Sequence, residues 1–189
     1  MAMDMHSHID RILWTEDQIS LRISQLAAQI VQDFPAPSSP PVFVGVLTGA
    51  SIFLADLVRK INLPITIDFV SSKSYGSGTV SNCAPTISRD LNVDVNGRHV
   101  ILVEDIVDTG HTLYKLIGHM KSKGASSVSV CTLLDKPARR KVDVQLVGEG
   151  KFYQGFECPD NFVVGYGMDF DELYRNLPYI GVLKPEHYS

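Results

Sequence analysis

The sequence has few cysteines and no long apolar run, and each shortage excludes a class of protein. Only 3 of its 189 residues are cysteine, at the widely spaced positions Cys83, Cys131 and Cys158. So few cysteines exclude a disulfide-rich secreted scaffold and predict reduced thiols in a cytoplasmic protein. No apolar stretch approaches the roughly 20 residues of a membrane-spanning helix. We therefore predict that the protein has no membrane partner.

Positive charge is also scarce. Lysine and arginine together number 17 against 21 aspartates and glutamates, which gives a net charge of −4. A nucleic-acid-binding protein needs a basic face, so we predict no nucleic-acid partner. The first ten residues lack the basic and apolar regions of a signal peptide, which again favours a cytoplasmic location. His6 and His8 leave two interpretations of this stretch open, a metal-binding tail and a disordered terminus.

Apolar strands alternate with amphipathic helices along the chain. Continuous apolar runs at Val42–Leu47 and Val128–Leu134 are typical of strands covered on both faces, and Phe162–Tyr166 predicts a further strand. The capping box Thr15–Gln18 predicts a helix start, and apolar residues at helical spacing follow it as far as Ile30. The alternation predicts one α/β domain over residues 1–189, with a mainly parallel twisted sheet flanked by helices. Ligands of such sheets bind at the carboxyl ends of the strands.

The most informative stretch is Val100–Thr112. A β-branched apolar run ends at the adjacent acids Glu104 and Asp105, and a third acid, Asp108, follows inside a Thr/Gly turn. Apolar residues at helical spacing come directly after the turn. Backbone N–H groups at a helix start favour an anion, usually phosphate, and carboxylates suit sugar hydroxyls or Mg²⁺. The stretch therefore predicts a site for a phosphorylated sugar with its metal.

This stretch resembles the phosphoribosyl pyrophosphate (PRPP) signature of the type I phosphoribosyltransferases. The resemblance extends from about Trp14 to the end of the chain, and Lys136 and the motif Phe162–Asp169 narrow it to the hypoxanthine-guanine members. It implies the type I phosphoribosyltransferase fold with a small hood, made largely from the C-terminal segment Phe162–Arg175. It also implies purine salvage by a transferase. In that reaction 5-phosphoribose passes, with Mg²⁺, from PRPP to N9 of hypoxanthine, guanine or xanthine, giving pyrophosphate and a nucleotide such as IMP or GMP.

The resemblance implies roles for the signature residues. Glu104 and Asp105 would hold the ribose hydroxyls, directly or through metal-bound water. Asp108 would be the general base that takes the proton from N7 of the purine. The 5′-phosphate would be bound by the turn and the helix start, namely Asp108, Thr109, Gly110, His111 and Thr112. His111 stands where many relatives have a basic residue, and a solvated helix residue is an equally good interpretation of it.

The resemblance also implies how the purine is recognised. Lys136 would donate to the 6-oxo group, and it would disfavour adenine because an ammonium group can only donate hydrogen bonds. Phe162 would stack on the flat face of the base. Val163 would contact the purine edge through its carbonyl, and Ile106 completes the implied base site.

The remaining implied roles concern pyrophosphate, metal and closure of the site. Thr48, Gly49 and Arg175 would bind pyrophosphate, with a Leu47–Thr48 peptide bond that is often cis in the family. Mg²⁺ would be held by Glu104, Asp105 and Asp169. A mobile lid at about residues 71–85, with Ser74 and Tyr75, would exclude water from the reacting ribose.

Two other classes of protein share parts of this pattern. A response-regulator receiver domain also has an acidic pair and a Lys-Pro pair, but its acids lie on different strands, whereas here three acids share one loop. A phosphoribosyltransferase-like regulator that binds nucleotide and RNA would need a basic face. The sequence does not rank the three purines. We expect a homodimer or a homotetramer, and the sequence does not choose between them.

Overall fold

The computed structural model describes residues 4–34, 39–73 and 86–188. The larger of its two sheets has the strand order β4-β3-β2-β5-β6-β7. Its strands are β2 (Val42–Leu47), β3 (Thr66–Lys73), β4 (Thr86–Arg89), β5 (His99–Val107), β6 (Ser127–Asp135) and β7 (Phe152–Glu157). Neighbouring strands are parallel except for β3 and β4. This sheet confirms the predicted α/β fold class.

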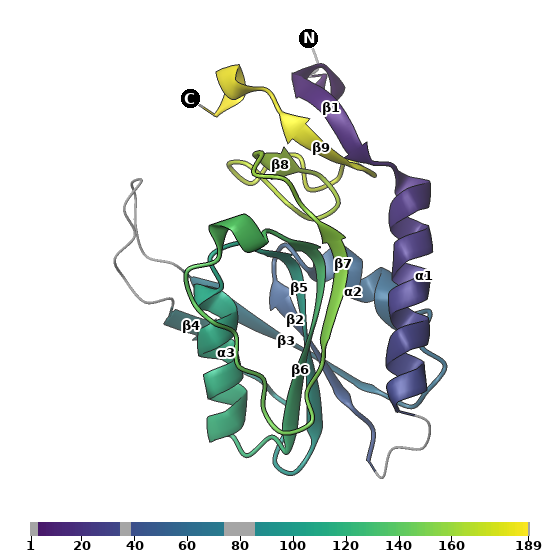
Figure 1. Ribbon diagram of the computed structural model, residues 1–189, viewed down its shortest axis with the longest axis vertical. Coiled ribbons are helices and arrows are strands. Elements are labelled where there is room, and N and C mark those ends of the chain that lie inside the picture. The colour runs from purple at the N-terminus through teal and green to yellow at the C-terminus, as the bar shows by residue number, and fades with distance from the viewer. Residues whose placement is uncertain (1–3, 35–38, 74–85, 189) are drawn as a thin grey trace.

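Helices cover both faces of this sheet (Figure 1). They are α1 (Glu16–Asp33), α2 (Ser51–Val58) and α3 (His111–Ser122). Alternating residues of β5 serve the two layers: Ile101 and Val103 pack with α1 and α2, while Val100 and Leu102 pack with α3. The central strands are therefore buried on both faces, which explains why they are continuous apolar runs.

The local sequence sets the ends of two helices. The predicted capping box begins α1, because the Thr15 hydroxyl accepts from the Gln18 N–H at 3.3 Å and the Gln18 side chain accepts from the Thr15 N–H at 2.9 Å. α3 begins after Gly110, whose φ is 87° and which provides no side-chain cap. Gly124 follows α3 with a φ of 83°, the left-handed conformation common after a helix.

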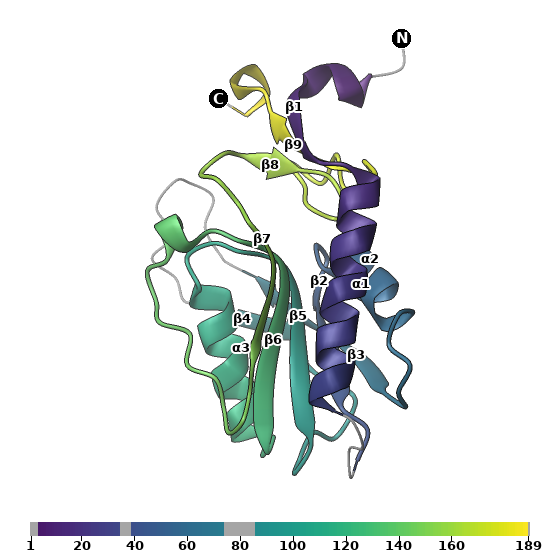
Figure 2. The same ribbon diagram turned by 45° about the vertical axis from the view of Figure 1, so that its right-hand side comes forward.

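A second, smaller sheet forms a hood above the carboxyl ends of the parallel strands (Figure 2). Its strands are β1 (Ile9–Trp14), β8 (Val163–Val164) and β9 (Ile180–Leu183). The strand order is β1-β9-β8, and both pairings are antiparallel. The hood therefore combines a strand from near each end of the chain.

Two expectations about the hood sequence were wrong. A strand was expected from Phe162 to Tyr166, but β8 has only two residues because the chain turns at Gly165 (φ 100°) and Tyr166 (φ 50°). Disorder was one interpretation of the N-terminus, yet Met5–His8 forms the 3₁₀ helix η1. Two tyrosine hydroxyls of the hood hold η1 in place: His6 is hydrogen-bonded to Tyr179 and His8 to Tyr174, both at 2.7 Å.

Two loops complete the large sheet, and the first differs from the sequence expectation. β3 continues to Lys73, so the lid expected at about residues 71–85 would begin within a strand; Ser74 and Tyr75 lie outside the described residues. After β6 the chain turns through η2 (Pro137–Arg139) and crosses the face that carries α3 before it reaches β7. A further 3₁₀ helix, η3 (Pro185–His187), follows β9.

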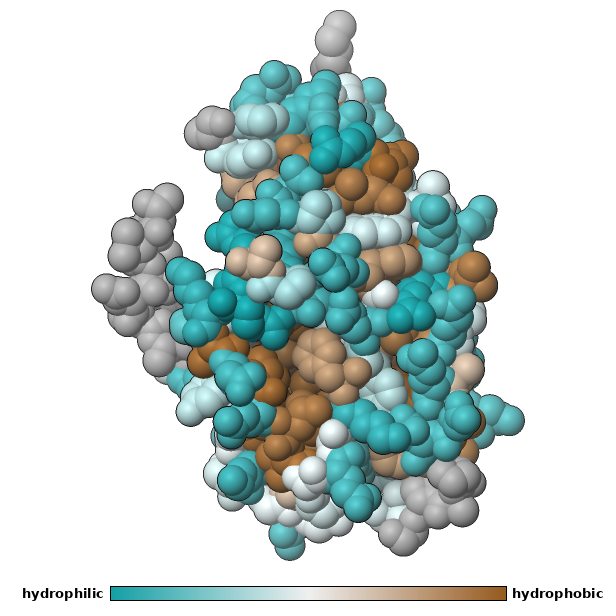
Figure 3. All heavy atoms as spheres, in the orientation of Figure 1, coloured by the Kyte–Doolittle hydropathy of each residue, from teal (hydrophilic) through white to brown (hydrophobic). Residues whose placement is uncertain are grey.

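The surface in Figure 3 is mainly hydrophilic, with hydrophobic side chains gathered around α3 and the segment after η2. Among the residues described, no helix combines the length and the apolar character needed to cross a membrane.

Candidate active site

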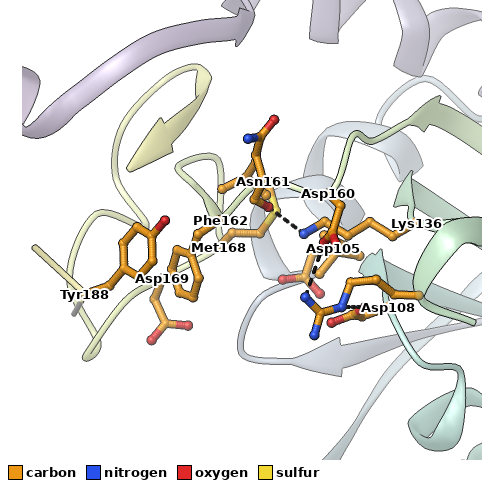
Figure 4. A pocket seen from close by; sticks show the side chains of 12 residues that line it. Asp105, Asp108, Lys136, Asp160, Asn161, Phe162, Met168, Asp169 and Tyr188 are labelled. Atoms are coloured by element: carbon orange, nitrogen blue, oxygen red, sulfur yellow. Dashed lines mark hydrogen bonds and ion pairs between the residues drawn. The ribbon is translucent and has the colours of Figure 1, made fainter. Parts of the chain in front are cut away.

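A cavity of about 460 Å³ lies between the carboxyl ends of β5 and β6 and the hood. Cavities of this volume bind small molecules in other proteins. Figure 4 shows acidic and basic side chains of the large sheet on one side of it and the aromatic rings of the hood on the other. The predicted site residues that line it are Asp105, Ile106, Asp108, Lys136, Phe162, Val163 and Asp169.

A second cavity of about 100 Å³ adjoins the first, and Ile106 and Asp108 line both. Its other predicted residues are Glu104, Thr109, Gly110 and Thr112. The uncapped N-terminus of α3 borders it, and such helix starts favour anions. His111 is exposed and lines neither cavity.

The acids Glu104 and Asp105 lie within β5, because the strand continues to Val107 instead of ending at Val103. Successive residues of a strand point to opposite faces, so Asp105 lines the larger cavity and Glu104 the smaller one. Burial, and next the charge of Asp105, raises the pKa of Glu104 well above its ordinary value. Burial also raises the pKa of Asp105. The arrangement penalises the ionised pair, as expected of a site that a cation completes.

One carboxylate oxygen of the Glu104–Asp105 pair lacks a hydrogen-bond partner among the described residues. Glu104 is 7% exposed, and among the described residues its Oε2 has no hydrogen-bond partner. A buried carboxylate oxygen without a partner is costly, so it identifies a position where an external donor or a cation would be stabilising. Oxygen ligands of this kind suit Mg²⁺, which needs only one or two carboxylates beside substrate and water.

The loop after β2 is held against this pair. The Leu47–Thr48 peptide bond is cis, as the family resemblance implied. Gly49 follows it, and a Cβ there would lie 1.8 Å from Oδ2 of Asp105, so no larger residue fits. Gly167 of the hood, with a φ of 100°, packs on the same loop: a Cβ there would lie 2.1 Å from the Gly49 carbonyl. Thr48 itself is exposed.

Lys136 follows the end of β6 and is almost fully buried, with 7% of its surface exposed. Its Nζ donates to the carbonyl of Asn161 at 2.6 Å (Figure 4). An ammonium group carries three N–H donors, so one carbonyl does not use its capacity. The buried cation therefore lies at the wall of the cavity with donors for an oxygen ligand.

Arg175 holds the part of the hood that packs on the loop after β2. Its guanidinium lies 2.9 Å from both the Asp169 and the Glu172 carboxylates and donates to the Gly167 carbonyl at 2.8 Å. Burial raises the pKa of Asp105, and the positive charge of Arg175 opposes that rise. Arg175 is thus a positive charge close enough to act on the acidic pair.

Sequence reasoning missed several cavity residues. They are Arg139, Asp160, Asn161, Met168 and Tyr188. Tyr188 stacks on Phe162, with ring centroids 4.7 Å apart and an angle of 18° between the planes. Figure 4 shows the Phe162 ring between Tyr188 and Lys136. Asn161 and Met168 adjoin the predicted residues Phe162 and Asp169, so their neighbours in the sequence could have indicated them. Tyr188 joins the site only through contacts between distant segments.

The fold and the two cavities define a protein that binds a phosphorylated small molecule at the carboxyl edge of an α/β sheet. The comparisons agree with this class. A family model described as a phosphoribosyl transferase domain matches residues 14–171. A hypoxanthine phosphoribosyltransferase from Haemophilus influenzae is 45% identical over 175 residues, which cover 92% of this chain and 94% of that protein. The chain therefore belongs to the phosphoribosyltransferase family, in its hypoxanthine-guanine branch.

Two further similarities describe the extent of the match. A crystal structure of a hypoxanthine phosphoribosyltransferase from Staphylococcus aureus has a TM-score of 0.89 and 42% identity, covering 100% of this chain and 99% of that one. The bifunctional protein TilS/HprT of Listeria monocytogenes is 44% identical over 185 residues. That match covers 98% of this chain but only 28% of the longer protein.

Proposed function

We propose that this protein is a purine-salvage enzyme that transfers 5-phosphoribose from PRPP to N9 of hypoxanthine or guanine, with xanthine as a further candidate. The products are the purine nucleotide and pyrophosphate. One observation carries the proposal: Asp108, Lys136 and Phe162 line one cavity, which adjoins a smaller one at the start of α3. A base, a donor and an aromatic face are what a 6-oxopurine needs.

The cavity walls support recognition of a 6-oxopurine. Lys136 offers donors only, so it favours a keto oxygen over the amino group of adenine. Phe162 offers an aromatic face, and Ile106 lines the same cavity. Val163, the first residue of β8, follows Phe162, and its carbonyl would accept a hydrogen bond from the purine edge. These groups would hold the base with N7 toward Asp108.

Asp108 would then accept the N7 proton as N9 attacks the anomeric carbon, C1′. The bond from C1′ to the pyrophosphate oxygen breaks, and its electron pair leaves with pyrophosphate. General-base assistance of this kind contributes roughly 10²–10⁴-fold to a rate. The 5′-phosphate would lie in the smaller cavity, at the N–H groups of Gly110 and of the first turn of α3.

Pyrophosphate and Mg²⁺ would lie where the loop after β2 meets the hood. Thr48 and Gly49 would contribute backbone N–H groups, and Arg175 its guanidinium. Glu104, Asp105 and Asp169 would be the carboxylate ligands of Mg²⁺. When bound, Mg²⁺ neutralises charge on the pyrophosphate leaving group. Glu104 and Asp105 fit this role because, among the described residues, Oε2 of Glu104 is buried without a hydrogen-bond partner and burial raises the pKa of both acids. The described part of the chain holds no ready-made cluster of three such ligands, so substrate oxygens would have to complete the metal site.

We also propose a cytoplasmic enzyme that assembles as a homodimer or homotetramer, without a nucleic-acid or membrane partner. The negative net charge of −4 supports the absence of a nucleic-acid partner.

The direct test is to incubate the protein with PRPP, Mg²⁺ and guanine or hypoxanthine and to measure nucleotide by absorbance and chromatography. We expect GMP or IMP with an equal amount of pyrophosphate, little product from adenine, and none in excess EDTA. Lys136→Ala should mainly raise the purine KM, by roughly 10–150-fold for a lost charged hydrogen bond. Asp108→Asn should instead lower kcat. Nucleotide formation that persists in EDTA would contradict the metal assignment, and absence of any nucleotide would contradict the function.

A further inference from the structure

Residues 139–142, which we call the strap, begin at the last residue of η2 and cross the turn that carries Asp108. The backbone N–H groups of Lys141 and Val142 donate to the Thr109 carbonyl at 3.0 and 3.2 Å. Arg140 donates to the Asp108 carbonyl at 3.3 Å, and its guanidinium also pairs with the carboxylate of Asp135 at the end of β6. The strap thereby fixes the backbone of the turn that carries Asp108.

The first strap residue contacts the Asp108 side chain itself. Nε of Arg139 lies 2.9 Å from Oδ1 of Asp108, and a terminal nitrogen of the same guanidinium lies 3.2 Å from Oδ1 of Asp160. Asp160 comes shortly before Phe162 in the chain. One guanidinium therefore connects the signature turn of β5 to the segment that supplies the aromatic wall of the cavity.

We infer that Arg139 is a positioning residue that orients the Asp108 carboxylate toward the purine. The inference rests on the proposed function, in which Asp108 is the general base. Two consecutive arginines contact the same residue: Arg140 donates a hydrogen bond to its carbonyl, and Arg139 forms an ion pair with its carboxylate. A carboxylate that must accept a proton from a ring nitrogen works only within hydrogen-bond reach of it, so its orientation governs the rate.

The planar fork of arginine suits this task. It can bind one acid through Nε and another through a terminal nitrogen, whereas lysine has a single point of contact. Proton transfer from the purine neutralises Asp108, which weakens its pairing with Arg139. The contact to Asp160 still holds the guanidinium in place at that moment. Arg139 can therefore re-form its ion pair with the Asp108 carboxylate once the proton leaves.

A surface ion pair without catalytic meaning is the competing explanation. The Arg139 side chain is 50% exposed and that of Asp108 43%, and pairs of this exposure contribute little to stability. The two explanations differ in how substitutions combine. If Arg139 acts through Asp108, removing Arg139 matters only while Asp108 is present.

The experiment is a double-mutant cycle on kcat for guanine at saturating PRPP and Mg²⁺. We expect Arg139→Ala to lower kcat about two- to fivefold with little change in purine KM, and Arg139→Lys to recover part of the loss. In an Asp108→Ala background the same Arg139→Ala change should have less than about a 1.5-fold effect. Arg59→Ala removes an exposed arginine ion pair at the end of α2, where Arg59 lines neither cavity, and should leave kcat unchanged.

Unfolding midpoints of all variants separate a change in catalysis from a loss of folded protein. An unchanged kcat in Arg139→Ala would overturn the inference, and so would an equal loss in the Asp108→Ala background. Either result in an active enzyme leaves the proposed function intact. A protein that forms no nucleotide at all would overturn the proposed function and this inference together.

Discussion

Asp68 on β3 and Glu104 on β5 are two buried acids with opposite properties. Asp68 is 5% exposed and Glu104 7%, so burial alone does not distinguish them. Asp68 accepts backbone hydrogen bonds from Phe69, Asn92 and Val93 at 2.7 to 2.9 Å. Glu104 keeps Oε2 without a partner among the described residues.

Their pKa values differ accordingly. Burial by itself would raise the pKa of Asp68, but the hydrogen bonds from Val93, Phe69 and Asn92 outweigh it and lower the pKa. For Glu104, burial and the neighbouring Asp105 both raise the pKa. A buried acid whose oxygens accept hydrogen bonds holds two segments together, whereas a buried acid with an unpartnered oxygen is a candidate for binding a ligand. Four predictions test this contrast.

The largest effect is expected from Glu104→Gln on catalysis. Removing a charge that would anchor ribose and Mg²⁺ should lower kcat/KM about 10²–10³-fold, the loss typical of one preorganised electrostatic contact. The free energy of unfolding should stay within about 1 kcal/mol of the original or rise, because a poorly partnered buried acid is costly. Steady-state kinetics and urea unfolding measure both quantities. A Glu104→Gln variant that is destabilised but fully active would contradict the contrast between Glu104 and Asp68.

Asp68→Ala should show the opposite pattern. It leaves three backbone N–H groups without their acceptor, at about 1–3 kcal/mol each, and partial rescue by water makes a total of roughly 2–4 kcal/mol reasonable. The KM values of the remaining folded protein should not change. Asp68→Asn retains one acceptor oxygen and is the matched control, with a smaller loss. A changed purine KM would show that Asp68 belongs to the active site after all.

Mg²⁺ should stabilise the protein through the acidic pair. In the presence of PRPP, adding Mg²⁺ at about ten times its dissociation constant should increase the free energy of unfolding by roughly 1.4 kcal/mol. The increase should vanish in Glu104→Gln and persist in Asp68→Asn. Thermal unfolding with NaCl at matched ionic strength provides the control. An equal increase in both variants would place the metal elsewhere.

The smallest effect concerns pH. The folded pKa of Asp68 lies below its ordinary value of 3.8, so the unfolded chain binds more protons in that range. Asp68 therefore contributes stability above about pH 4 and loses it as the pH falls through the folded pKa. The stability difference between the original protein and Asp68→Asn should shrink below about pH 4. Unfolding curves at pH 3 and pH 6 measure it, and a constant difference would refute this account.

The elements with regular apolar patterns could be predicted from sequence. The apolar run Val42–Leu47 is β2 residue for residue, and the helix after the signature has its expected apolar face buried. β1 could not be predicted, because its exposure does not alternate and register shifts interrupt its pairing with β9. A strand is recognised in a sequence by alternating apolar and polar residues, and this strand lacks that alternation.

The hood turns were also beyond sequence reasoning. Non-glycine residues with positive φ gather there, and they are Tyr166, Asp171, Glu172 and Tyr174. Local preferences oppose this conformation, so tertiary packing must impose it. For the site, the strand ends pointed to Asp105 and Lys136, and the family resemblance pointed to Phe162; all three line the main cavity. These signals could not reveal Arg139 or Tyr188, whose places depend on distances between remote segments, nor distinguish Asp68 from Glu104.

The pairing of β1 with β9 has a consequence for synthesis on the ribosome. β1 is made first, yet its partner strand is among the last to emerge, with Ile9 opposite Leu183 and Trp14 opposite Ile180. The α/β layers can form from contacts between nearer segments, but the hood must wait for a contact that spans almost the whole chain. Such distant pairings form slowly because a long loop must close first. A nascent chain would therefore carry a folded large sheet with an open cavity, and its aromatic wall would be assembled only after β9 has emerged.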